Sequence, residues 1–359
     1  MSCFSPLWAI PYKPTHPKYG QFMVVSMKDS HVVDFDSSKP FYVDSSTGET
    51  LSMIRVPCGK CVGCRLDYSR EWASRIVMES LDYPTSSIFL TLTYDQEHVP
   101  CKLTDGSDSV VHGLEQAERT GVHGLTLVKK DMQDFWKRLR RNIDYNFDDE
   151  HKIRYYCAGE YGGETHRPHY HACVFGVPDD LFEVGKNKFG DSLYDSSLIR
   201  ESWGQGNITI GALDMKTAAY TARYTLKKAQ GQDHSYNDTL GIEREFVTMS
   251  RKPGLGVNYY LEHKDEIYRN DEIILPSSSK DKKNVVKPPR YFDILFNADS
   301  PKEMAKIKQA RGIAAELDHA ALMADLKERE LDEVAYLEIC ERAKQEKIKT
   351  LVRGDCFTS

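Results

Sequence analysis

Two apolar segments joined by a glycine-rich turn constrain the fold of this chain more than any other feature. Residues 154–159 and 169–175 are rich in aromatic and β-branched side chains, and Tyr161-Gly162-Gly163-Glu164-Thr165 between them has turn composition. The pattern predicts an antiparallel hairpin. The same reasoning predicts another buried strand at 88–94, and apolar periodicity predicts helices at 67–81, 131–142 and 216–228.

The second strand of the hairpin begins with His169-Tyr170-His171. Side chains at i and i+2 of a strand share one face, so the two imidazoles lie side by side and Tyr170 points to the opposite, apolar face. The first strand ends in Gly159-Glu160, and the Glu160 carboxylate can close on the same face as the histidines. These three side chains predict a mixed nitrogen and oxygen site for Mg²⁺ or Mn²⁺ bound together with phosphate oxygens. The alternative is that both histidines only pack in the core.

The predicted helix at 216–228 carries Tyr220, Tyr224 and Lys227 at helical spacing, which places them on one face. This stretch contains four basic residues and no acidic residue. A phenol is a poor nucleophile at its free pKa and needs a cation or a metal-polarised electrophile nearby to attack phosphorus. The stretch therefore predicts a nucleophilic helix, with core packing of the two tyrosines as the alternative.

Three cysteines, Cys58, Cys61 and Cys64, lie within seven residues and predict a metal site. Zn²⁺ takes four ligands, so Cys3 or Cys101 would complete the site, and we favour Cys3 because it lies in the same N-terminal region. A ferredoxin-type run would need a cysteine at position 68, which is Tyr68. The alternative is a knuckle of reduced thiols without metal.

The formal net charge of −6 excludes a uniformly basic coat for nucleic acid, but local basic stretches remain. The predicted helix around 131–142 combines cations with Phe135 and Trp136, a composition suited to a nucleic-acid backbone and its bases. The predicted DNA-binding residues are Lys137, Arg138, Arg140, Arg141, Arg223 and Lys228. The alternative is a solvated basic helix face.

The order of segments predicts three regions: a Cys-rich region at 1–66, a catalytic domain at 67–262, and a linker with helices at 263–359. Residues 101–124 are predicted to be a polar loop, 277–283 a linker, and the chain beyond Pro301 a series of helices. No run of about 18 apolar residues predicts a membrane span. The N-terminal residues show no pattern of a secretory signal.

The motif order resembles that of the HUH endonucleases that initiate rolling-circle replication. The closer resemblance is to the replication-initiation proteins of gokushovirus-type microviruses, which are small single-stranded DNA phages. The matching segments span about 56–256 and comprise Val56-Pro57-Cys58-Gly59-Lys60-Cys61, Phe89-Leu90-Thr91-Leu92-Thr93-Tyr94, Gly159-Glu160-Tyr161-Gly162, His169-Tyr170-His171, Tyr220-x3-Tyr224-x2-Lys227 and Met249-Ser250-Arg251-Lys252-Pro253-Gly254-Leu255-Gly256.

This resemblance implies an α+β fold with a central five-stranded antiparallel sheet packed on helices. It also implies that one tyrosine attacks a phosphodiester at the viral-strand origin, leaving a 5′-phosphotyrosine and a free 3′-OH primer, and that the second tyrosine allows the circle to be rejoined. The implied metal ligands are Glu160, His169 and His171, and Lys227 offsets developing charge. The implied partners are single-stranded DNA and host helicase or polymerase, in the cytoplasm of the infected bacterium.

Two other classes of function fit parts of the same sequence. A non-enzymatic, zinc-organised DNA-binding protein would use the cysteines and basic helices and leave the histidines and tyrosines as packing residues. A metal-dependent nuclease would use activated water in place of a tyrosine. The two classes differ from the tyrosine enzyme in one product, the covalent protein–DNA link.

Overall fold

The computed structural model describes most of the chain. The described residues are 3–16, 20–25, 32–33, 41–43, 50–103, 109–120, 122–148, 152–163, 165–229, 235–276 and 283–349; only the backbone is described for 11–16, 20–25, 32–33, 41–43, 52, 120, 122–123, 224–229, 235–236 and 349. The chain divides into two compact units: residues 68–304 with 353–359, and residues 1–67 with 305–352. The predicted division into 1–66, 67–262 and 263–359 stays a prediction.

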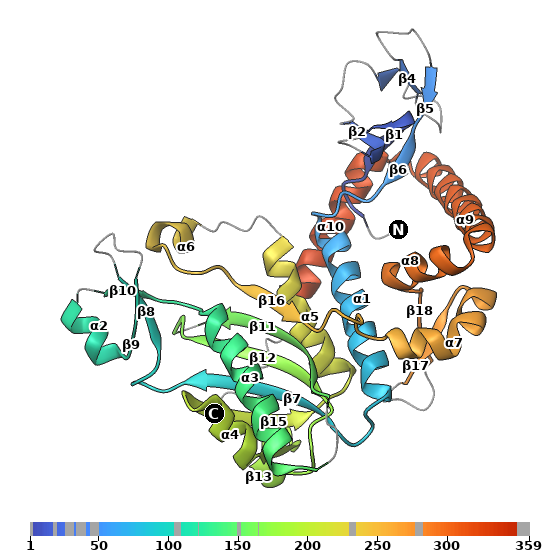
Figure 1. The fold of residues 1–359 in the computed structure, drawn as a ribbon. Helices are drawn as coiled ribbons and strands as arrows, with labels where there is room; N and C mark the ends of the chain where they lie inside the picture. Colours follow the sequence, from blue (N-terminus) through green and yellow to red (C-terminus); the bar gives the residue numbers. More distant parts are fainter. Residues whose placement is uncertain are drawn as a thin grey trace. The chain divides into compact units, whose positions relative to one another are not determined.

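The larger unit is built on one antiparallel sheet of seven described strands in the order β13-β14-β15-β7-β12-β11-β16 (Figure 1). The prediction of a mixed fold with an antiparallel sheet is confirmed. The sheet is wider than the five strands that the resemblance implies, because the β13–β14 hairpin extends one edge. The strands are β7 (Ser87–Tyr94), β11 (Arg154–Tyr161), β12 (Pro168–Phe175), β13 (Phe182–Lys186), β14 (Ser192–Asp195), β15 (Gly206–Ala212) and β16 (Phe246–Met249).

One face of this sheet is covered by α3 (Lys129–Asn146) and α4 (Ser197–Trp203) (Figure 1). The apolar stripe of α3 contributes Met132, Phe135, Trp136 and Leu139 to the core. Alternate residues of β12, among them Tyr170, belong to the same core, as do alternate residues of β7 and β15. The buried apolar stripe explains why α3 forms here, since its intrinsic preference is reinforced by one continuous packing surface.

The opposite face of the sheet packs against α5 (Met215–Ala229), which contacts β11, β12 and β16. The thiol of Cys173 in β12 lies 3.5 Å from the hydroxyl of Thr221 in α5, and both residues are buried. The part of α1 (Val62–Leu81) within this unit lies against the same face, where Trp72 contacts the ring of Tyr156 at 5.3 Å between centroids. Strand alternation thus sends neighbouring residues of β12 to two different helical layers.

Residues 101–124 are not the polar loop that their composition predicts. They contribute to a three-stranded sheet and a short helix, because Cys101 and Ala117 bury their small side chains in the main core. These elements are β8 (Pro100–Leu103), β9 (Val110–His112), α2 (Leu114–Thr120) and β10 (Val122–Leu125). The remaining elements of the unit are α6 (Ser235–Leu240), α7 (Val257–Asn270), β17 (Ile273–Leu275), β18 (Asn284–Val286) and α8 (Arg290–Asp299).

The smaller unit joins the N-terminal region to the C-terminal helices, which lie 250 or more positions away in the sequence. Its N-terminal part forms short antiparallel strands where irregular structure was predicted. The strands are β1 (Leu7–His16), β2 (Gly20–Val25), β3 (Val32–Val33), β4 (Phe41–Val43), β5 (Thr50–Ser52) and β6 (Ile54–Val56). The helices are α9 (Pro301–Glu328), whose first residues belong to the larger unit, and α10 (Glu333–Lys349).

Within the smaller unit, α10 is tied to the N-terminal region by polar contacts. Arg55 forms an ion pair with Glu333 at 2.6 Å, and the Glu341 carboxylate accepts a hydrogen bond from the backbone N–H of Val62 at 3.2 Å. A carboxylate at the first turn of a helix satisfies an N–H group that has no partner within the helix. None of the helices in the described residues has the length and apolar character that crossing a bilayer requires.

Candidate active site

Three ionisable side chains converge on one face of the central sheet. Glu160 lies directly opposite His169 in the β11–β12 pairing, and His171 follows two residues along on the same face. The Glu160 Oε1 atom lies 2.7 Å from His169 Nε2 and 3.0 Å from His171 Nε2. All three residues are buried. The structure therefore brings the three predicted metal ligands together.

The spacing of these three donor atoms fits a divalent metal. Ligands at right angles around an ion at about 2.1 Å are about 3.0 Å apart, which is close to the two distances from Glu160 Oε1. Two imidazoles and one carboxylate form a three-ligand set that leaves further positions of an octahedral ion for phosphate oxygens or water. The group could hold Mg²⁺ or Mn²⁺ in this way.

A second layer of contacts orients both imidazole rings. The backbone carbonyl of Arg167 lies 3.1 Å from His169 Nδ1 and can only accept, so Nδ1 carries the proton and Nε2 keeps its lone pair for the metal. The Thr91 hydroxyl lies 2.9 Å from His171 Nδ1. Phe89 stacks on the His171 ring with centroids 5.5 Å apart. Such partners raise metal affinity by fixing the ring and its tautomer.

The electrostatics of the triad favour an ionised carboxylate. Burial alone would raise the pKa of Glu160, but hydrogen bonds with His169 and His171 outweigh it and hold this pKa well below its ordinary value. A carboxylate that stays charged at neutral pH is a competent ligand for a hard cation.

Helix α5 brings Tyr220 to the triad. Its hydroxyl lies 3.4 Å from His171 Nε2, and its ring meets those of His171 and Phe89 edge to face at 5.1 and 6.1 Å. The phenol oxygen is therefore next to the atoms that would bind the metal. The intermediate exposure of Tyr220 leaves this part of the helix accessible from outside.

The other predicted residues of α5 are less completely placed. Tyr224 lies one helical turn beyond Tyr220 in the same helix, but the side chains of Tyr224, Lys227 and Lys228 lie outside the described residues. Arg223 is exposed. The roles assigned to these four residues stay predictions.

The basic residues of α3 lie on the other face of the sheet from the triad, because the apolar stripe of that helix packs on the Tyr170 side. Arg138 donates hydrogen bonds to the carbonyls of Ser202 and Trp203, and Arg140 donates to the carbonyl of Ile153. Both of these guanidinium groups hold the fold together. Lys137 and Arg141 are exposed, and their predicted contact with DNA stays a prediction.

The predicted cysteine cluster is also assembled, in the smaller unit. The Cys58 and Cys64 sulfurs are 4.0 Å apart, and those of Cys61 and Cys3 are 3.9 Å apart. The edge of a tetrahedral Zn–S₄ site at about 2.3 Å per bond is about 3.8 Å. Cys101 lies in the core of the larger unit, with its thiol directed to the Val99 carbonyl, so Cys3 is the fourth member of the group.

Backbone N–H groups surround these sulfurs. The Phe4 N–H donates to Cys61 Sγ at 3.2 Å, and the Cys58 N–H donates to Cys3 Sγ at 3.3 Å. Burial raises the pKa of Cys61, but N–H donation from Cys64 and Phe4 lowers it further, to about 7. Burial raises the pKa values of Cys3 and Cys64. The four sulfurs could hold one metal ion, and binding would release protons from the thiols.

Sequence reasoning assigned no role to Thr91, Phe89 or Tyr161. The first two lie on the triad face because β7 is the neighbour of β12, a pairing that local patterns do not reveal. A weak signal was present, since Thr91 and Thr93 are polar side chains at alternate positions of an otherwise apolar strand.

Comparison with known proteins identifies the family. A family model for replication-associated proteins of the ORF2 kind matches residues 87–229, which include the triad and α5. "Replication-associated protein ORF2" of Spiroplasma virus 4 is 34% identical over 263 residues, 73% of this chain and 71% of that protein. "Replication-associated protein VP4" of Bdellovibrio phage phiMH2K is 30% identical over 277 residues, 74% and 76% of the two chains.

A third relative, "Replication-associated protein ORF4" of Chlamydia phage 1, is 27% identical over 225 residues, 61% of this chain and 49% of that protein. No solved structure matches the chain. The first two relatives combine at least 30% identity with coverage of more than two thirds of both chains. The chain therefore belongs to the family of replication-associated proteins of microvirus-type phages.

Proposed function

We propose that this protein nicks single-stranded DNA at a phage replication origin by tyrosine transesterification. The observation that carries the proposal is the position of the Tyr220 hydroxyl, 3.4 Å from a ring nitrogen of the Glu160–His169–His171 triad. A nucleophile, three metal ligands and a family of replication-associated proteins point to the same chemistry. The resemblance to HUH endonucleases supports it further.

A divalent ion held by Glu160, His169 and His171 would polarise the scissile phosphate and hold it for in-line attack. Tyr220 Oη forms a bond to phosphorus while the bond to the 3′ oxygen breaks. The phenol gives up one proton and the departing 3′ oxygen takes one up, so the exchange is balanced. Its products are a 5′-phosphotyrosine and a free 3′-OH.

A second tyrosine in the same helix suits repeated cleavage and joining. Tyr224 follows Tyr220 by one turn, and it would attack after a full round while Tyr220 is still linked to DNA. The 3′-OH released by the second cleavage then attacks the first phosphotyrosine and closes the circle. No external energy source is needed, because each phosphotyrosine link replaces one phosphodiester.

The covalent link tests this proposal directly. Purified protein is incubated with Mn²⁺ and single-stranded oligonucleotides that tile the genome encoding it, and the products are resolved on a denaturing gel. We expect a covalent protein–DNA band with the wild type. Tyr220→Phe and Tyr224→Phe should each retain some first cleavage and lose circular product, and the double variant should form no adduct.

Tyr145→Phe is the matched control, since Tyr145 is an exposed tyrosine of α3 on the other side of the sheet. It should leave the adduct unchanged. Nicked DNA without an adduct would instead support a nuclease that uses water, and binding without either product would support a non-enzymatic module. A double variant that still links to DNA would place the nucleophile elsewhere.

We also propose that Cys3, Cys58, Cys61 and Cys64 hold one structural Zn²⁺. Four thiolates leave no open position for substrate, which is typical of structural sites. Elemental analysis should find about one zinc per chain, and Cys64→Ser should lose it. Cys101→Ala, which removes a buried thiol outside the cluster, should keep it. A folded wild-type protein without metal would contradict the assignment.

A further inference from the structure

A cavity of about 660 Å³ opens beside the first turn of α3, on the side of the sheet that faces away from the triad. Pockets that bind small ligands commonly measure about 300–1,000 Å³, so the volume is sufficient for one nucleotide. The walls come from β8, β9, the segment that enters α3, and the segment between α6 and β16. None of these residues takes part in the proposed chemistry.

Positive charge dominates the cavity. Its lining includes the cations Lys102, Lys129, Lys130 and Arg244 and the carboxylates Asp238 and Glu243. The excess is local, because the whole chain carries a net charge of −6. Lys129 pairs with Glu243, and Arg244 pairs with Asp238, so the carboxylates hold two of the cations in place. A cavity of this kind attracts phosphate groups.

The backbone and the apolar lining support the same ligand. Helix α3 has 18 residues and begins at the cavity, and its N-cap residue, Val128, provides no side-chain cap, so the positive end of the helix dipole adds to the field of the lysines. Leu127, Val128 and Ile242 supply apolar surface beside the charged rim. An anionic group next to an apolar ring system is the chemistry of a nucleotide.

Strand β11 connects this cavity to the triad. Tyr161 follows Glu160 in the strand and points to the opposite face. Its hydroxyl accepts a hydrogen bond from the Leu127 N–H at 3.0 Å and donates one to the Glu243 carbonyl at 2.5 Å, and both of these residues line the cavity. The cavity and the triad therefore flank the same end of β11.

We infer that this cavity binds one unpaired nucleotide of the DNA strand that the triad cleaves, with its phosphate on the lysines and its base on the apolar surface. The inference rests on the proposed nicking function. A strand that passes over the end of β11 would then be held on both sides of the sheet, which fixes the position of the scissile phosphate.

The lysines of α3 provide a matched test. Lys130 and Lys137 are both exposed, and both pair with Asp134, but only Lys130 lines the cavity. Binding of a fluorescent single strand of about 20 nucleotides is measured by anisotropy in EDTA, so that cleavage plays no part. Each phosphate contact on single-stranded DNA releases about 0.7 of a counterion, which corresponds to roughly fivefold in affinity at about 0.1 M salt.

We expect Lys130→Gln to weaken binding about fivefold and to make the slope of log K against log salt less steep by about 0.7. Lys137→Gln should change neither quantity. Val110→Glu, which puts a carboxylate at an exposed position of the lining, should weaken binding more than Lys130→Gln. Equal losses for the two lysine variants, or no loss for Lys130→Gln and Val110→Glu, would overturn the inference.

Two further readouts separate this inference from the function on which it rests. The same preparations are tested for the covalent adduct with Mn²⁺: a wild type without adduct defeats the nicking proposal, whereas adduct with undiminished binding in the cavity variants defeats only the cavity. A deoxynucleoside triphosphate is titrated as competitor. Competition that Lys130→Gln abolishes, combined with unchanged strand binding, would assign the cavity to a free nucleotide and overturn the inference.

Discussion

The two faces of the central sheet differ in what covers them and in what their side chains do. On the α3 side, Tyr170 lies in a large apolar core, and its hydroxyl bonds to Tyr94 and to the backbone of Val128. On the α5 side, His171 meets Glu160, Thr91 and Tyr220. Adjacent residues of one strand therefore belong to a packed core and to a cluster of ionisable groups.

This difference separates stability from activity. Apolar burial on the α3 side stabilises the fold. Buried ionisable groups on the α5 side are costly unless a partner or a metal compensates for the loss of hydration. Sites of this kind persist for function, and we expect substitutions there to affect activity far more than the free energy of unfolding.

The largest expected contrast is between His171→Gln and Tyr170→Phe. His171→Gln removes a metal ligand, and loss of about 4 kcal/mol of metal assistance lowers nicking about 10³-fold. Its free energy of unfolding should change by less than about 1 kcal/mol. Tyr170→Phe removes only the hydroxyl and leaves buried partners unpaired, which costs about 1–3 kcal/mol. Nicking per folded Tyr170→Phe molecule should stay within about twofold of the wild type.

Urea unfolding and single-turnover nicking assays measure the two quantities on the same samples. Binding of single-stranded DNA by His171→Gln in EDTA shows whether the variant keeps its DNA-binding surface. The division between the faces would be refuted by an active His171→Gln protein, or by a Tyr170→Phe protein that is stable and inactive.

The sequence was informative where structure depends on local periodicity. Alternation within 169–175 placed His169 and His171 on one face and Tyr170 on the other, and the adjacent glycine turn placed Glu160 across the hairpin, as the structure shows. Helical periodicity likewise located α3 and α5 to within a few residues. These features depend on residues close together in the chain, so their pattern carries the information.

Features that depend on distant pairing could not be predicted. β7 lies between β12 and β15, and only this order brings Thr91 to His171. The side of the sheet that α3 covers follows from the same long-range arrangement. The strands within 100–125 are short, and their apolar residues are too few to stand out from a loop.

The contact between Thr91 and His171 gives a prediction of intermediate size. Thr91→Val keeps the shape of the side chain and removes the oxygen beside His171 Nδ1. Loss of such a partner lowers metal affinity about 10–100-fold. Nicking should therefore require more Mn²⁺, with the maximal rate largely restored at saturation. Titration of nicking activity with Mn²⁺ measures the shift.

Thr91→Ser should restore the wild-type requirement, because it returns the hydroxyl. Thr93→Val is the matched control: Thr93 lies on the same face of the same strand, but its hydroxyl donates to the Asn207 carbonyl at 3.4 Å. An equal Mn²⁺ shift for Thr93→Val would show that any loss of a hydroxyl from β7 perturbs the site, and that Thr91 has no specific role.

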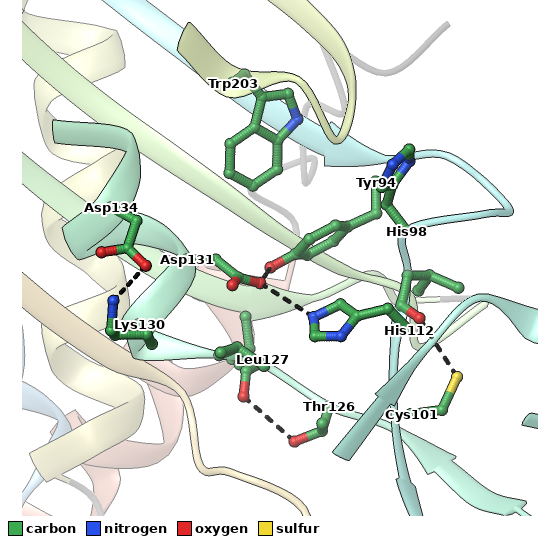
Figure 2. A network of polar contacts seen from close by, with 12 residues as sticks. Tyr94, His98, Cys101, His112, Thr126, Leu127, Lys130, Asp131, Asp134 and Trp203 are labelled. Carbon is green, nitrogen blue, oxygen red and sulfur yellow. Dashed lines mark hydrogen bonds and ion pairs between the residues drawn. The ribbon is translucent and has the colours of Figure 1, made fainter. Parts of the chain in front are cut away.

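The smallest expected effect lies on the α3 side, where His112 approaches Asp131 at 3.8 Å and the same carboxylate accepts a hydrogen bond from Tyr94 (Figure 2). Asp131 raises the pKa of His112 above its ordinary value, and partial burial opposes this shift. Protonated His112 therefore stabilises the fold below about pH 6.5, and the contribution disappears as the pH rises through the higher folded pKa. Because His112 is partly exposed, the contribution should be about 0.5 kcal/mol or less. The free energy of unfolding of His112→Gln, compared with the wild type at about pH 5.5 and pH 8.5, isolates it. A difference between the two proteins that is the same at both pH values would mean that the pair does not stabilise the fold, whereas nicking per folded molecule should be equal in the two proteins, since this pair lies on the face that carries stability.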